Sequence, residues 1–149
     1  LDGKCLGMNT KRRDVDMNLI SLHGGLMGLG FLCMVVAIII ARFYKKKDWW
    51  FKVHRGLNVA APILAVAGII TAIVMVTPAY GVQLPLAHHI IGLITLVLLI
   101  AQPVLGFSMV KSKDKDKKAQ LRKMHRILGW VTPVMYLVAI IAVEIAVGG

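Results

Sequence analysis

The stretch KVHRGL at residues 52–57, followed by Pro62, returns later in the chain as KMHRIL at residues 123–128, followed by Pro133. The shared pattern is K-x-H-R-x-L-x-x-x-x-P. Each copy places a histidine at the start of a long apolar run, directly after a basic loop. A histidine in that position still reaches the interior of a membrane. The repeat therefore predicts two equivalent helices, each with a histidine near its beginning.

The composition of the chain excludes an ordinary soluble domain. Its 149 residues are 58% hydrophobic and 17% charged, whereas soluble domains are roughly half apolar and a quarter charged. In a soluble protein, the net charge of +11 would suggest nucleic acid as the first partner to consider. Here the charges are confined to short segments between apolar runs, which is typical of membrane proteins. We therefore expect contact with membrane lipid and no nucleic-acid partner.

Four long apolar runs predict four membrane-spanning helices. About 20 apolar residues cross a bilayer as a helix, and only helices and closed barrels satisfy every backbone group in lipid. The runs lack period-2 alternation, and short connections make neighbouring helices antiparallel. The expected fold is an all-α membrane protein, an antiparallel four-helix transmembrane bundle. Its helices are expected at about residues 19–43, 54–78, 86–110 and 125–147, in a domain of residues 19–149 after a polar N-terminal segment at residues 1–18.

The basic residues predict the orientation of this multi-pass chain. Fourteen of the 18 lysines and arginines lie in or beside the connections after the first and third runs, and the connection at residues 79–85 has none. The positive-inside rule places the two basic connections in the cytoplasm, so both termini are expected on the outer, non-cytoplasmic face. The fourteen are Arg42, Lys45, Lys46, Lys47, Lys52, Arg55, Lys111, Lys113, Lys115, Lys117, Lys118, Arg122, Lys123 and Arg126.

All five histidines lie near the beginning of an apolar run, which sets their depth. The first and third helices begin at the outer face, and the second and fourth begin at the inner face. His23 therefore shares the outer depth with His88 or His89. His54 shares the inner depth with His125. With a membrane core of about 30 Å and a helical rise of about 1.5 Å per residue, the two levels lie very roughly 20 Å apart.

Two histidine pairs of matched depth point to a metal-containing cofactor. Ionisable residues in a membrane are costly and mark functional sites, although a lone histidine is more often a hydrogen-bonded interior residue. Zinc requires four N, S or O donors, and neither level offers a third strong donor. Two imidazoles on facing helices, with an apolar gap between them, suit the two axial positions of a haem. The chain has no C-x-x-C-H motif for covalent haem attachment.

Glycines near the histidines favour this interpretation. Gly92 follows His88 by four residues and Gly129 follows His125 by four, so each lies on the same helical face as its histidine. A missing side chain there gives a flat macrocycle room to approach. Small residues also pack helices together in membranes, which is the alternative role. Gly92 favours His88 as the outer ligand, and His89 is the second choice.

Polar residues near the histidines are candidates for supporting a cofactor. Haem propionates need cationic or polar partners, although lysine and arginine also collect at helix ends without a ligand. Gln102 and Asn58 could form hydrogen bonds near a haem or between helices. Glu144 is expected at the outer interface rather than in a proton relay. The cationic candidates are Lys52, Arg55, Lys123 and Arg126 at the inner face and Arg13 at the outer face.

Four short motifs follow one another along the chain: HGGLM at residues 23–27 with AR at 41–42, WFKVHR at 50–55, HHIIG at 88–92 with QPVLG at 102–106, and HRILGW at 125–130. Together they resemble the cytochrome b561 family, most closely the four-histidine core of the b561/ferric-reductase transmembrane domains. The resemblance covers nearly all of residues 20–147. It implies two stacked, non-covalent b haems, ligated by the first and third and by the second and fourth histidines, and electron transfer across the membrane.

These patterns predict a di-haem transmembrane electron-transfer protein with a cytoplasmic or membrane donor and an acceptor on the outer face. The redox partners are expected to be a small molecule, a quinone or a redox protein, as for a transmembrane oxidoreductase of ferric-reductase or quinone-linked type. One alternative is a haem-bearing anchor subunit of a larger redox complex, with partner subunits or a second copy of the chain. Another is a histidine-lined metal or proton transporter, which a red, reducible protein would exclude.

Overall fold

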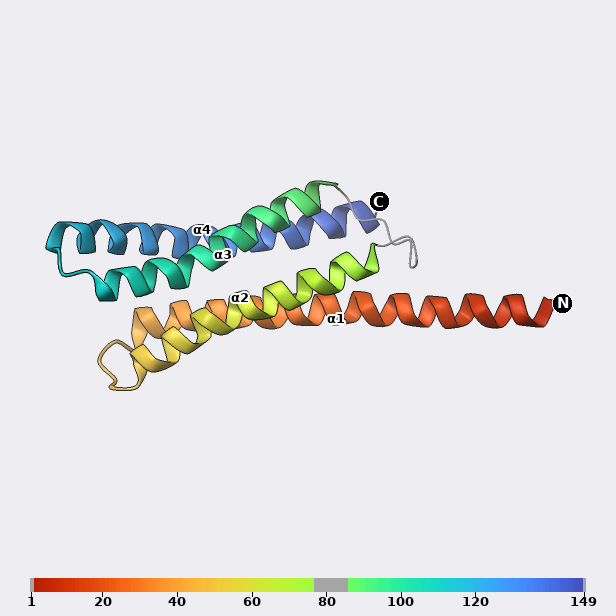
Figure 1. The fold of residues 1–149 in the computed structure, drawn as a ribbon, viewed down its shortest axis with the longest axis horizontal. Helices are drawn as coiled ribbons and strands as arrows, with labels where there is room; N and C mark the ends of the chain where they lie inside the picture. Colours follow the sequence, from red (N-terminus) through yellow and green to blue (C-terminus); the bar gives the residue numbers. More distant parts are fainter. Residues whose placement is uncertain (1, 77–85, 149) are drawn as a thin grey trace.

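Four long antiparallel helices make up the part of the chain that the computed structural model describes, residues 2–76 and 86–148. Each contains a segment long and apolar enough to cross a membrane, which confirms the predicted all-α transmembrane bundle. Both basic connections lie at one end of the bundle, which we call the inner end, on the left of Figure 1. The helices are α1 (Asp2–Phe43), α2 (Trp50–Met75), α3 (Leu86–Lys111) and α4 (Lys115–Gly148).

Two helices begin ten or more residues earlier than the sequence predicts. The polar N-terminal segment belongs to α1, which starts at Asp2 instead of residue 19 and runs beyond the other helices (Figure 1). This segment has no proline, and extending an existing helix is much easier than starting one. Helix α4 starts at Lys115 instead of residue 125. Asp114 caps it, because its Oδ1 accepts hydrogen bonds from the backbone N–H groups of Asp116 (2.8 Å) and Lys117 (3.1 Å).

The other helix ends lie close to their predicted positions. Helix α2 runs from Trp50 to Met75 instead of residues 54–78, and α3 is one residue longer than expected at its inner end. The predicted uncharged turn at 79–85 lies outside the described residues. Pro62, Pro103 and Pro133 lie inside α2, α3 and α4, respectively. The apolar runs therefore predict the spans well, and the errors fall on the polar flanks.

The helices pair as two hairpins, α1 with α2 and α3 with α4. Each hairpin packs closely along its length, whereas contacts between the hairpins are far fewer. The hairpins meet in a buried core that receives residues from all four helices and lies between the two histidine levels. We call this cluster the midlevel core, and it consists of Met34, Ala61, Ala65, Leu99 and Tyr136. It divides the bundle into an inner half and an outer half.

Candidate functional site

The outer histidine pair spans the two hairpins. His23 on α1 and His88 on α3 have ring centroids 6.4 Å apart and ring planes inclined by 79°. Both side chains are partly buried. His89 is exposed and touches the His88 ring at a centroid distance of 6.4 Å. The structure therefore places His88, the first choice from the sequence, opposite His23.

The inner histidine pair spans the hairpins in the same way. His54 on α2 and His125 on α4 have ring centroids 6.1 Å apart and ring planes inclined by 84°. Asn58, one turn after His54, donates a hydrogen bond to the backbone carbonyl of His54 (2.9 Å). Its Nδ2 also lies 3.1 Å from His54 Nε2. The four histidines thus meet as two pairs, each formed by one residue from each hairpin.

A backbone carbonyl orients each histidine of the first hairpin. Nδ1 of His23 lies 2.8 Å from the carbonyl oxygen of Gly68 on α2. Nδ1 of His54 lies 2.9 Å from the carbonyl oxygen of Ala37 on α1. Because a carbonyl oxygen only accepts hydrogen bonds, Nδ1 carries the hydrogen and Nε2 keeps its lone pair. Metal-binding histidines are usually held in this way.

The second hairpin repeats this arrangement. Nδ1 of His88 lies 2.8 Å from the carbonyl oxygen of Ala139 on α4. Nδ1 of His125 lies 3.1 Å from the carbonyl oxygen of Gln102 on α3. Each helix of a hairpin therefore supplies one histidine. It also supplies the backbone carbonyl that accepts a hydrogen bond from the histidine of its partner helix. Nε2 of His23, His88 and His125 remains available to a ligand, and at His54 a ligand would replace the amide of Asn58, whose Nδ2 lies 3.1 Å from Nε2.

The same spacing recurs in all four helices. The accepting carbonyl comes fourteen residues after the histidine of its own helix, as in the step from His23 to Ala37. Fourteen residues rise by about 21 Å, which sets the distance between the two levels. Sequence reasoning missed these carbonyls, although the small residues at three of the positions were a signal. Those residues are Ala37, Gly68 and Ala139.

The separation of the rings matches that of two ligands on one metal ion. A metal–imidazole nitrogen bond is about 2.0–2.1 Å long, so two imidazoles that held one metal ion between them would have ring centres about 6 Å apart. The two pairs have centroid distances of 6.4 and 6.1 Å. Two strong nitrogen donors at each level suit an iron whose other four ligands come from a porphyrin.

Space for a flat group lies beside the histidines. A Cβ added at Gly92, one turn after His88, would meet no atom within 4 Å. A Cβ added at Gly129, one turn after His125, would meet only Nε2 of Gln102, at 4.0 Å. Both glycines are partly buried. Space for a Cβ is therefore open beside one histidine at each level, and room for a macrocycle stays a prediction.

A buried amide without a partner lies at the inner level. Gln102 is 4% exposed, and its Nε2 has no hydrogen-bond partner among the described residues. Leaving such a donor unpaired costs about 1–3 kcal/mol, so it indicates a missing partner. This donor lies near the open space at Gly129. The ligand atoms, the space and the unpaired donor all fit a haem at the inner pair.

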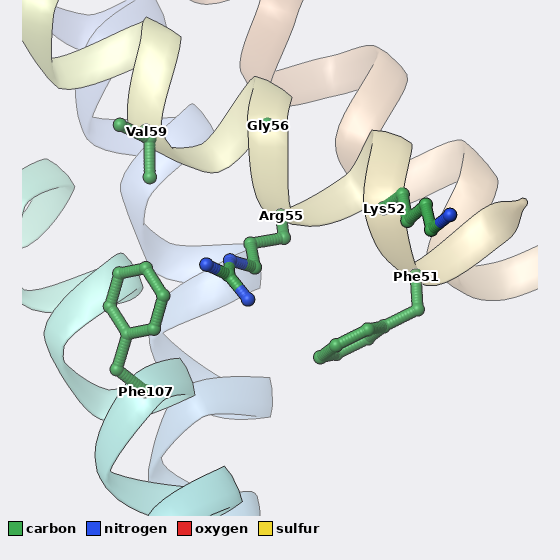
Figure 2. A pocket seen from close by; sticks show the side chains of 6 residues that line it. All are labelled: Phe51, Lys52, Arg55, Gly56, Val59 and Phe107. Carbon is green, nitrogen blue, oxygen red and sulfur yellow. The ribbon is translucent and has the colours of Figure 1, made fainter.

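Only two of the four predicted inner cations share one site. Lys52 and Arg55 line a pocket of about 540 Å³ between α2 and α3, and the Arg55 guanidinium lies 5.1 Å from the centre of the Phe107 ring. Lys123 and Arg126 are exposed on α4 and do not line this pocket. Figure 2 shows the pocket, whose lining residues are Phe51, Lys52, Arg55, Gly56, Val59 and Phe107.

The remaining candidates lie near the outer end. Glu144 is exposed on α4, five residues beyond the carbonyl of Ala139 that accepts from His88. Arg13 belongs to the first part of α1, whose side chains lie outside the described ones. A cationic partner for the outer site therefore stays a prediction.

If a haem binds between His23 and His88, Gly92→Val is expected to weaken its binding about tenfold, because the added side chain would fill the open space beside His88 and overpacking costs about 1–3 kcal/mol. Without haem, the same space is open, so the helix content should be unchanged. Haem titration of the haem-free protein measures the affinity. The matched control is Gly28→Val, which also meets open space but lies on an exposed face of α1. Equal affinities in the two variants would contradict the assignment.

Four helices long and apolar enough to cross a membrane hold two pairs of facing, carbonyl-oriented imidazoles at two levels, which defines a class of membrane bundle built around paired histidines. The sequence pattern of the family described as eukaryotic cytochrome b561 matches residues 22–147, and the chain belongs to this family. No curated protein and no solved structure matches the chain. Membership of the family implies haem b cofactors and transmembrane electron transfer through haem.

Proposed function

We propose that the chain binds two b haems, an outer one between His23 and His88 and an inner one between His54 and His125. The observation that carries this proposal is the spacing of the two pairs, 6.4 and 6.1 Å between ring centroids, with every Nδ1 engaged by a carbonyl. When bound, the haem iron accepts and releases one electron at a time. The protein supplies fixed imidazoles at two levels, about 21 Å apart along each helix.

We infer that electrons enter at the inner pair and leave at the outer pair. With the basic connections in the cytoplasm, both termini lie on the outer face. The inner surface then carries fourteen basic residues against the acidic residues Asp48, Asp114 and Asp116. Such a field raises the local concentration of anionic partners and speeds their encounter. It favours an anionic reductant or an acidic donor protein in the cytoplasm.

The pocket between α2 and α3 supports a donor site next to the inner pair. Arg55 follows His54 directly, and Lys52 lies on the preceding turn. Phe51 and Phe107 add aromatic walls (Figure 2). Two cations above apolar walls suit a small anion with a planar or apolar part. We propose that the donor docks in this pocket, one residue along the helix from an inner ligand.

Reduction of protein sealed in oriented liposomes tests the direction. A membrane-impermeant anionic donor is expected to reduce the haems about tenfold faster from the basic face, and added salt should diminish the difference. The double variant Lys52→Gln/Arg55→Gln should lose more of this rate than Lys111→Gln/Lys113→Gln, which removes the same charge outside the pocket. Equal rates from both faces, without dependence on salt, would overturn the direction and leave only a two-haem conduit.

A further inference from the structure

Tyr136 joins the two hairpins between the histidine levels. Its side chain is 2% exposed in the midlevel core. Its hydroxyl donates a hydrogen bond to the backbone carbonyl of Met27 on α1, at 2.8 Å. Each of the four histidine–carbonyl bonds stays within its own hairpin. The Tyr136 bond instead ties α4 to α1, which are the most weakly packed of the neighbouring helices.

The surroundings of Tyr136 allow the close approach of α1. Gly30 is buried, and a Cβ added there would lie 3.5 Å from the Tyr136 hydroxyl and 3.2 Å from the carbonyl oxygen of Ala61. The ring of Phe31 packs against the Tyr136 ring at a centroid distance of 5.3 Å. A Cβ at Gly30 would therefore press on the backbone of α2 and touch the Tyr136 hydroxyl at ordinary van der Waals distance, so only a longer side chain there would push α1 away from α4. Close packing of this kind holds membrane helices together where lipid provides no hydrophobic drive.

A group bound between either histidine pair would tie together the same two hairpins. His23 and His54 belong to the first hairpin, and His88 and His125 belong to the second. Because each helix runs through both levels and the midlevel core, fixing the hairpin separation at one level restricts it at the others. Three interactions therefore restrict the distance between the two hairpins: a group bound at the outer pair, the Tyr136 hydrogen bond, and a group bound at the inner pair.

We propose that Tyr136 is a positioning residue that holds the two hairpins at the separation both histidine pairs need before any haem is bound. This inference rests on the proposed ligation by the two pairs. In the wild-type chain the first haem meets a preformed site. Without the Tyr136 bond, the first haem must also draw the hairpins together, and the second haem then finds them docked. Loss of the bond therefore weakens the first binding step and makes filling more cooperative.

Haem titration of the full chain tests the inference. Haem-free protein in detergent is titrated with haem b, and native mass spectrometry counts chains carrying none, one or two haems. Tyr136→Phe, which keeps the ring packed on Phe31, is expected to weaken the first binding step about tenfold. The population with one haem should fall severalfold below that of the wild type. Tyr44→Phe is the control, because Tyr44 is exposed in the inner connection.

Two further readouts separate positioning from general destabilisation. Electron paramagnetic resonance of the fully loaded Tyr136→Phe protein should show shifted signals from both haems, because both sites share one hairpin separation. Gly30→Leu, whose side chain extends beyond a Cβ that already lies 3.5 Å from the Tyr136 hydroxyl, should weaken the first binding step in the same direction. If Tyr136→Phe has the wild-type binding steps and signals, this inference fails. If the wild type itself does not take up two haems, the proposed function fails instead.

Discussion

His125→Ala is expected to lower the haem content of the purified protein from two per chain to one. The inner iron would lose one of its two nitrogen ligands, and an alanine leaves only His54 at that level. The outer pair, about 21 Å away along the helices, should keep its haem. A pyridine haemochrome assay gives the ratio, and potentiometric titration should show one low-spin component in place of two.

A buried position on the same helix provides the control for this variant. Thr132 is fully buried, and its hydroxyl bonds to the carbonyl of Leu128 in its own helix, so Thr132→Val should keep both haems. Two haems retained in His125→Ala would show that His125 is not a ligand. A ratio below one in the folded wild type would remove the two-haem assignment altogether.

His88→Ala is expected to abolish the outer haem, whereas His89→Ala should leave it in place. The two residues are adjacent and chemically identical, so each variant controls for the other. Only His88 faces His23, and only its Nδ1 reaches the carbonyl of Ala139. His89 is exposed and lies outside the pair. The outer component of the reduced-minus-oxidised spectrum measures the effect, and its loss in His89→Ala alone would reverse the choice of ligand.

Gln102 has one property that can be predicted from the sequence and two that cannot. Its position near the inner level follows from counting along the apolar run. Its burial and missing partner depend on how α3 and α4 pack against each other. The same limit applies to Lys52 and Arg55, which share a pocket with Phe107 of another helix. Lys123 and Arg126 have the same motif context and are exposed like Lys52 and Arg55, but they do not line this pocket.

The early starts of α1 and α4 have a different cause. Both involve polar segments, where the apolar pattern that predicts a membrane span carries no information. Asp114 is a good N-cap by residue type, so the beginning of α4 at Lys115 was accessible from local sequence. The extension of α1 to Asp2 is permitted by the absence of proline from residues 1–18 and has no positive signal in the sequence.

The four spans and the two depths at which histidines lie can be predicted from the amino-acid pattern alone, because both follow from apolar length and helical rise. The pattern also favoured His88 through Gly92. Which atoms meet depends on how the helices pack. A histidine reaches a carbonyl on a neighbouring helix only for one register and rotation of the hairpin, and neither is encoded in local pattern. The fourteen-residue relation between histidines and carbonyls, the Arg55 pocket and the Tyr136 bond between hairpins all depend on that packing.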